Sequence, residues 1–188
     1  MRFIMFAAFL LALAGPVLAG SGKMSYAVSP GYSNPFGGEW AKSYKSAQFI
    51  SVGAEYDNGG EFRKGVELGY DFGHDNKLIT KCSPKIFYVA PYLKEMRISD
   101  KWEYYGVIGI GVYNRLSNRY TDAGVTYKGG PSGKLGINGG FGFAYHVTPG
   151  LKLGFDLRVH HIIKFIGIGP QLVDANNLVP TLTLQKTF

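Results

Sequence analysis

The stretch RVHHIIKF, residues 158–165, is the part of the sequence whose residue types look most catalytic. Its adjacent His160 and His161 have the chemistry of general bases, and such a base needs a nucleophile within hydrogen-bond reach. No Ser lies within reach on this stretch. The sequence therefore favours a structural histidine pair, with one side chain pointing inward and the other near an outer rim.

A second stretch, GIGVYN at residues 109–114, begins like the glycine-rich fingerprint of a dinucleotide site. Asn114 stands where the third glycine of that fingerprint belongs, and no helix follows, so these glycines indicate a strand. The single cysteine, Cys82, cannot form a disulfide within the chain. We therefore expect no cofactor and no disulfide framework.

The net charge of +7 raises the question of an acidic partner. The sequence has no zinc-ligand spacing, no RNA-binding aromatic motif and no basic helix, which excludes the usual nucleic-acid-binding classes. We expect no nucleic acid, and anionic lipid headgroups are the better candidate partner.

The first twenty residues have the pattern of a secretory signal peptide. One basic residue, Arg2, precedes an apolar run, and Val17 and Ala19 occupy the −3 and −1 positions of a cleavage site. The run is too short for a comfortable transmembrane helix, although an uncleaved helical anchor is the alternative. The prediction is a cleaved signal peptide at 1–19 and one exported domain at 20–188.

From Met24 onward the chain divides into alternating segments of about ten residues, the length of a tilted strand that crosses a bilayer. Their approximate limits are 24–32, 46–56, 61–72, 84–96, 102–113, 133–145, 151–164 and 178–188. Pro91 makes the fourth segment the weakest, because proline removes a ladder hydrogen bond in the middle of a strand.

The linkers between these segments alternate strictly between short and long. Three are short and turn-like, at 57–60, 97–101 and 146–150, and four are long and polar, at 33–45, 73–83, 114–132 and 165–177. A meander with this alternation has its tight turns at one end and its long loops at the other, as outer-membrane barrels do.

Side-chain parity separates an apolar face from a polar face. Tyrosines and tryptophans cluster near the segment ends, as interfacial girdles require. A soluble barrel would place the apolar parity inside, whereas here the polar parity is predicted to line the lumen; a soluble sandwich is the alternative. The predicted lumen network is Glu55, Arg63, Glu67, Asp71, Glu103, Lys134, Asn138, Asp156, Arg158, His160 and Gln185.

These features, with YYGVIGIGVYN and the closing TLTLQKTF, resemble the small outer-membrane β-barrel proteins related to the transmembrane domain of outer membrane protein A and to opacity-type proteins. The resemblance implies an all-β fold: an eight-stranded antiparallel up-and-down transmembrane β-barrel with short periplasmic turns and long extracellular loops. It also implies that Leu182, Leu184 and Phe188 form the signal that the barrel-assembly machinery reads, with Lys186 departing from the family pattern.

Eight strands enclose a lumen that side chains can fill, and the inward acids and bases are nearly balanced in number. We therefore expect paired charges that plug the lumen, with a narrow ion channel as the alternative. Outer-membrane lipid A deacylases are also eight-stranded barrels and carry a His and a Ser two residues apart. Here Ile162 and Ile163 stand two residues beyond the histidines, so an enzyme is the second alternative. His74 and His146 fall at opposite ends of the barrel and predict no metal site.

The long loops contain Lys42, Lys45, Lys77, Lys81, Arg115, Arg119 and Lys128 together with Trp40, Tyr44, Tyr120 and Tyr127. This mixture is suited to phosphate-bearing lipopolysaccharide or to a partner surface, and solvated loop charge is the alternative. The overall expectation is a monomeric, non-enzymatic barrel in the bacterial outer membrane. Its partners would be outer-membrane lipid and lipopolysaccharide, and its role envelope structure or surface interaction.

Overall fold

A computed structural model describes residues 22–79, 82–116, 118–122, 125–129, 132–168 and 171–188; within these, no side chain of residues 118–132 or 164–173 is described. The predicted signal peptide at 1–19 and loop residue Lys81 lie outside the described residues.

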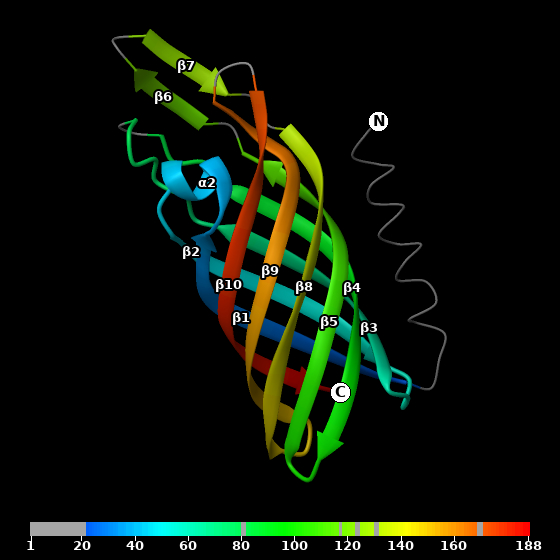
Figure 1. Cartoon of the computed structure of the whole chain (residues 1–188). Helices are drawn as coiled ribbons and strands as arrows, with labels where there is room; N and C mark the ends of the chain where they lie inside the picture. The colour runs from blue at the N-terminus through cyan, green and yellow to red at the C-terminus, as the bar shows by residue number, and fades with distance from the viewer. Residues whose placement is uncertain (1–21, 80–81, 117, 123–124, 130–131, 169–170) are drawn as a thin grey trace.

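Eight antiparallel strands close into a barrel in the order β1-β10-β9-β8-β5-β4-β3-β2 (Figure 1). The barrel strands are β1 (Lys23–Pro35), β2 (Ala47–Asp57), β3 (Phe62–Asp71), β4 (Ile86–Ser99), β5 (Trp102–Arg115), β8 (Ser132–Thr148), β9 (Leu151–Ile168) and β10 (Gln171–Thr187). Each strand pairs with its neighbour in sequence, apart from the closing contact between β1 and β10 and the insertion between β5 and β8. The predicted eight-stranded up-and-down barrel is confirmed.

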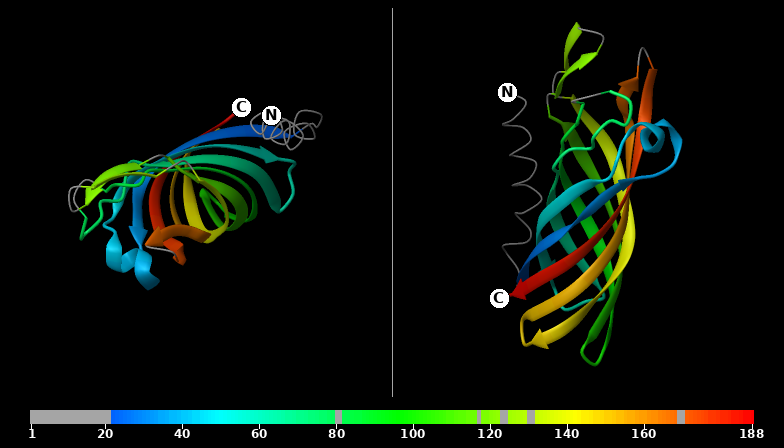
Figure 2. Two further views of the ribbon diagram at one scale, coloured as in Figure 1. Left: turned by 90° about the horizontal axis from the view of Figure 1, so that it is seen from above. Right: turned by 90° about the vertical axis from the view of Figure 1, so that its left-hand side faces the viewer.

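The long connections gather at one end of the barrel and the tight turns at the other, as the two side views show (Figures 1 and 2). Two of the long connections carry structure that the sequence did not predict. The first contains a short helix, α2 (Gly38–Ser43), and the third forms a hairpin of β6 (Asn118–Asp122) and β7 (Val125–Gly129). No helix among the described residues is long and apolar enough to cross a membrane.

The predicted long loop at 165–177 is wrong. β9 continues to Ile168 and β10 begins at Gln171, with a register shift between Val173 and Ala175. The polar residues that suggested a loop alternate across the two faces of β10. Asn176 faces outward and bonds to β9, whereas Asn177 is buried and bonds to α2. Polar side chains with partners on both faces can continue a strand beyond the apolar band.

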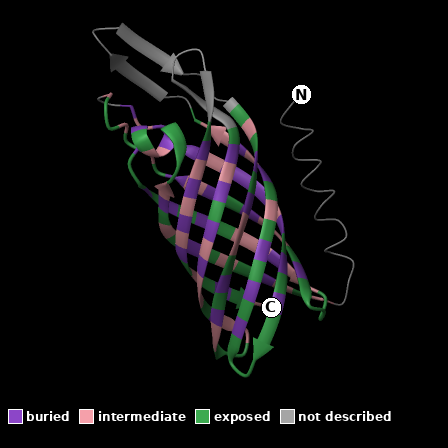
Figure 3. Ribbon diagram, viewed as in Figure 1, coloured by how far each residue is buried: buried purple, intermediate pink, exposed green. Residues whose placement is uncertain are grey.

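Burial alternates along most of the barrel wall and produces a chequered pattern (Figure 3), with a break in β4, where Tyr88, Val89 and Ala90 are all buried. The outward parity includes Ile108 and Leu182, each 67% exposed, and the inward parity includes the buried acids Glu55 and Glu103. Pro91 lies in β4 on the outward parity, and the pairing of β4 with β5 skips Ala90 and Pro91. The missing proline donor is therefore accommodated at an interruption of that ladder.

The last strand closes the barrel against the first. Ser25 pairs with Thr187, and the Phe188 backbone N–H donates to the Met24 carbonyl oxygen at 2.9 Å. The Phe188 ring is 75% exposed and meets the Tyr26 ring edge-on at 6.0 Å between centroids. The alternating residues at the end of the sequence are therefore the closing strand, whose apolar side chains face outward.

Candidate functional site in the lumen

The periplasmic half of the lumen is organised around the guanidinium of Arg63, on β3. Its nitrogens lie 3.4 Å from a Glu55 oxygen, 2.9 Å from an Asp57 oxygen and 3.4 Å from a Glu103 oxygen. Lys152 donates to Glu103 at 2.6 Å. Arg63, Glu55, Glu103 and Lys152 are all buried, so each charge has an opposite charge within ion-pair distance where water is scarce.

Lys94 and His146 complete this periplasmic network. The Lys94 ammonium lies 2.5 Å from the second oxygen of Glu55 and 4.4 Å from the centre of the Tyr105 ring. His146 Nε2 lies 2.8 Å from Glu103, and its side chain is partly exposed at the periplasmic mouth. The network therefore runs from the mouth to the waist of the barrel through side chains from β2, β3, β4, β5, β8 and β9.

At the waist, a second cluster forms around Arg158. Its guanidinium lies 3.2 Å from Glu67 and 3.7 Å from Asp156, and Thr183 donates a hydrogen bond to Asp156 at 2.7 Å. A cavity of about 20 Å³ remains between the Arg158, Lys94 and β1–β10 side chains. This volume is room for about one water molecule. This cavity is therefore too small to hold a column of water.

Tyr88 and Tyr92, both on β4, cross the lumen. The Tyr88 hydroxyl donates to Glu67, and the Tyr92 hydroxyl donates to Glu55 at 3.2 Å. The two rings lie over Gly69 and Gly65 of β3, where an added Cβ would come within 2.2 and 2.3 Å of ring carbons. Glycine at these two positions is what allows the rings to lie flat across the barrel.

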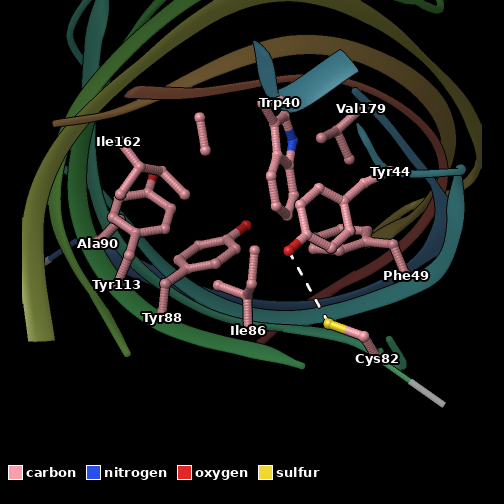
Figure 4. Packing of buried hydrophobic residues seen from close by; sticks show 11 residues of the cluster. Trp40, Tyr44, Phe49, Cys82, Ile86, Tyr88, Ala90, Tyr113, Ile162 and Val179 are labelled. Carbon is pink, nitrogen blue, oxygen red and sulfur yellow. Dashed lines mark hydrogen bonds between the residues drawn. The ribbon is translucent and has the colours of Figure 1, made fainter. Parts of the chain in front are cut away.

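The extracellular half of the lumen is filled by apolar and aromatic side chains, which we call the plug (Figure 4). The plug consists of Trp40, Tyr44, Phe49, Cys82, Ile86, Tyr88, Ala90, Tyr113, Ile162, Ala175 and Val179. Trp40, on α2, is completely buried; its Nε1–H donates to Asn177 at 2.7 Å and its ring packs on Tyr44 at 4.2 Å between centroids. The first extracellular loop therefore folds into the barrel and closes it.

Backbone hydrogen bonds hold this first loop to the second loop. The Lys77 backbone N–H donates to Ser43 at 2.8 Å, the Lys77 ammonium donates to the Ala41 carbonyl oxygen at 2.6 Å, and the Lys45 N–H donates to Asp75 at 2.9 Å. Burial raises the pKa of the Tyr44 phenol to about 12, so this member of the plug is neutral at physiological pH.

The sequence analysis placed Trp40 and Tyr44 in a loop mixture suited to lipopolysaccharide or to a partner surface, but both side chains are buried in the plug and are not available to such a ligand. Polar neighbours in the sequence made the segment look solvated, but a six-residue helix turns both rings toward the lumen. Lys42 and Lys45 remain exposed, and the side chains of Arg119, Tyr120, Tyr127 and Lys128 are outside the described part of the structure.

The two adjacent histidines face opposite sides of β9. His160 is buried, and its Nδ1 lies 2.9 Å from the Tyr113 hydroxyl. His161 faces outward, where its Nδ1 lies 2.6 Å from Asn176 Oδ1. The residues that flank His161 on the neighbouring strands are Ile137 and Asn176, so neither flanking position offers a hydroxyl nucleophile.

The other two histidines lie at opposite ends of the barrel. His74 is buried against the Trp40 ring of the plug, 3.6 Å from Asp71 and 2.9 Å from the Lys45 carbonyl oxygen, whereas His146 lies at the periplasmic mouth. Among the described residues, no group of three or more His, Cys, Asp or Glu side chains is arranged to hold a metal ion.

The structure buries ten of the eleven residues predicted for the lumen network and leaves Lys134 half-buried at the extracellular end of β8. The buried ten are Glu55, Arg63, Glu67, Asp71, Glu103, Asn138, Asp156, Arg158, His160 and Gln185. They do not form one network. Asp71, Asn138 and His160 lie near the plug, apart from the ion pairs around Arg63 and Arg158.

The sequence analysis missed several inward residues, above all Lys94, Lys152 and Tyr92. Lys94 and Tyr92 share a parity with Tyr88 on β4, and Lys152 shares one with Asp156 on β9, so strict parity counting could have found them. In the fourth segment, which contains Tyr92 and Lys94, both parities are rich in apolar residues, so the inward face did not stand out in the sequence.

Solved structures that share this fold include three with which the barrel can be compared. Neisserial surface protein A is 13% identical with a TM-score of 0.57, and the match covers 89% of this chain and 96% of that one. Ail, the attachment invasion locus protein of Yersinia pestis, solved in complex with the heparin analogue sucrose octasulfate, is 15% identical with a TM-score of 0.55, covering 89% and 99%. The outer membrane enzyme PagL is 14% identical with a TM-score of 0.51, covering 87% and 98%.

Identities this low establish the fold and leave activity open. No curated protein matches the sequence. The family model described as the outer membrane protein beta-barrel domain matches residues 5–184, nearly the whole chain. Together with the closed barrel and its outward apolar parity, this match shows that the chain belongs to the outer membrane protein β-barrel domain family.

Proposed function

We propose that the protein is a closed, non-enzymatic barrel of the outer membrane that serves the envelope through its stable wall and its extracellular surface. The observation that carries this proposal is the filled lumen. Ion pairs occupy the periplasmic half, and the plug occupies the extracellular half. A filled lumen offers no path for transport, so the loops are the part of the barrel that other molecules can contact.

Single-channel recording in planar bilayers tests the closed lumen. The purified full-length chain should give no ion-conducting steps, because the cavity at the waist has room for only about one water. A general porin in the same bilayer serves as the positive control. Regular conductance steps from the wild-type chain would favour a narrow channel instead.

The enzyme alternative rests on the outward His161 and its bond to Asn176, which resemble a base and an orienting group. The residue two positions along the same face is Ile163, and an isoleucine has no nucleophilic atom. Lipid A from cells that express the wild type should therefore have the same mass as lipid A from cells that express His161→Ala. A mass change seen with the wild type and lost in that variant would show a lipid A-modifying enzyme.

The apolar outward parity supports placement of the mature chain in the outer membrane as a monomer, after export and removal of residues 1–19. Heat-modifiable migration in detergent gels tests this placement, since closed barrels resist unfolding by detergent at low temperature. Recovery of the chain in the soluble periplasm would overturn it.

Assembly is proposed to depend on Leu182, Leu184 and Phe188, which all face outward on the closing strand. Deletion of Phe188 should sharply reduce the inserted fraction, whereas Thr187→Ala should insert normally, because the substitution removes a side-chain bond to the Ser25 hydroxyl near the rim and leaves the backbone bond to Gly150 intact. Equal insertion of the Phe188 deletion and the wild type would mean that the machinery does not read this residue.

The exposed loop cations support a surface that meets anionic molecules such as phosphate-bearing lipopolysaccharide. Lys45 and Lys77 are exposed at the extracellular end. The similar barrel Ail was crystallised with a polysulfated sugar. This likeness is one of fold, so it supports only the general idea that a small barrel can bind an anionic sugar at its loops.

A further inference from the structure

Arg115 and Lys134 point inward at the extracellular mouth of the barrel. Arg115 is the last residue of β5 and pairs with Ile86 of the plug on one side and with Ser132 on the other. Lys134 pairs with Tyr113, two residues before Arg115 on the same inward parity. The two cations are therefore diagonal neighbours on one wall, a spacing that long side chains can bridge.

The plug forms a floor beneath these two cations. Ile86 and Tyr113, their direct cross-strand neighbours, are both members of the plug and almost completely buried. The charge of Arg115 also reaches the Tyr44 phenol, where it lowers the pKa against the larger opposing effect of burial. A group that enters the mouth would thus meet two positive charges and then a closed floor.

Neither cation has a partner within the described part of the chain, in contrast to the lysines and arginines deeper in the lumen. Arg63, Lys94, Lys152 and Arg158 each lie within ion-pair distance of a carboxylate. Arg115 and Lys134 are half-buried, and Arg115 Nε is buried without a hydrogen-bond acceptor. A buried donor without an acceptor is costly, and two neighbouring like charges repel.

We propose that Arg115 and Lys134 form a binding site for a phosphate or sulfate group carried on a surface sugar. A doubly charged oxyanion would neutralise both cations, and its oxygens would accept from the guanidinium, including the unsatisfied Nε–H. This inference deepens the proposed function, on which it rests, by naming the chemistry that the extracellular surface recognises. The sugar would remain outside, because the plug blocks the way below.

Titration of the full-length protein in detergent micelles with glucose 6-phosphate tests the site. The Nε–H resonance of Arg115, observed by nitrogen NMR, should shift with the phosphosugar and stay unchanged with glucose. Arg115→Gln and Lys134→Gln should each weaken binding about tenfold or more, as expected for loss of a charged hydrogen bond. Lys85→Gln is the matched control, because Lys85 is exposed beside Arg115 and lies outside the mouth.

A second arm separates two sources of the same chemistry. Protein in vesicles that contain phosphorylated lipopolysaccharide is compared with protein in vesicles whose lipopolysaccharide has been dephosphorylated. A shift of the Arg115 resonance only with the phosphorylated lipid supports the site and assigns its ligand to the protein's own membrane, whereas a shift only with the soluble phosphosugar supports the site and assigns an external ligand.

Two outcomes would overturn the inference. One is an unchanged Arg115 resonance in both arms, and the other is equal weakening by Lys85→Gln and Arg115→Gln, which would indicate diffuse surface charge. If Arg115→Gln fails to show heat-modifiable folding, Lys134→Gln carries the test. Failure of the proposed function is distinguishable, since conductance and lipid A mass are measured without any phosphosugar.

Discussion

The two halves of the lumen are closed by opposite chemistry. The periplasmic half is filled by charged side chains that lie in ion pairs around Arg63 and Arg158, and the extracellular half is filled by the plug, in which Trp40 is the largest buried side chain. The ion pairs come entirely from barrel strands, whereas Trp40 comes from a loop. The periplasmic half is therefore as rigidly held as the strands that carry it, whereas the part of the plug that comes from a loop can move without unfolding the barrel.

The largest effect is expected from Arg63→Ala. The substitution leaves Glu55, Asp57 and Glu103 without their shared cation, and removal of one partner from a buried ion pair typically costs about 3–5 kcal/mol. Urea unfolding of the chain in lipid vesicles measures the loss. A loss below about 1 kcal/mol would show that Lys94 and Lys152 alone neutralise the buried acids and that the periplasmic half is not centred on Arg63.

Gly69→Ala should be the next most damaging change. A Cβ at this position would come within 2.2 Å of the Tyr88 ring, and Tyr88 is held against Tyr113 and His160 on its other sides. Overpacking of this kind costs about 1–3 kcal/mol.

Gly53→Ala is the matched control, because its nearest neighbour would lie at an ordinary 3.6 Å. The same urea titration compares the two variants. Equal stability of Gly69→Ala and Gly53→Ala would mean that Tyr88 can move and that the junction between the two halves is loosely packed.

Trp40→Phe should have a smaller, local effect. Phenylalanine keeps the apolar contact with Tyr44 but leaves the buried Asn177 oxygen without its donor. We expect the free energy of unfolding to fall by about 1–2 kcal/mol. Hydrogen exchange should show faster opening of α2, reported by the Tyr44 N–H that donates to the Trp40 carbonyl oxygen, with no change in the barrel strands. Faster exchange throughout the strands would contradict a separable plug.

Arg97→Ala should have the smallest effect and serves as the counterpart of Arg63→Ala. Arg97 also pairs with two acids, Glu61 and Glu95, but its side chain is 63% exposed on the outside of the periplasmic end. Exposed ion pairs contribute roughly 0–1 kcal/mol. A loss as large as that of Arg63→Ala would mean that burial is not what distinguishes the lumen pairs.

Much of the barrel could be predicted from the alternation of apolar and polar residues, because successive side chains of a strand point to opposite faces. Glu55, Glu67 and Arg158 were placed inside on that basis, and the structure buries all three. The reading failed where a pattern had two interpretations. Asn176 and Asn177 looked like a loop but continue β10, and Lys94 was lost in a segment that is apolar on both faces.

The sequence by itself determined the eight barrel strands, the three tight turns at one end and the polar lumen, because these follow from local periodicity and from turn residues. Tertiary structure alone decided that Trp40 closes the mouth, that Arg63 gathers three acids, and that Arg115 and Lys134 lie side by side on one wall without a partner among the described residues. Each of these depends on contacts between residues far apart in the chain. The closure and register that bring them together are properties of the whole barrel and are not encoded in any one segment.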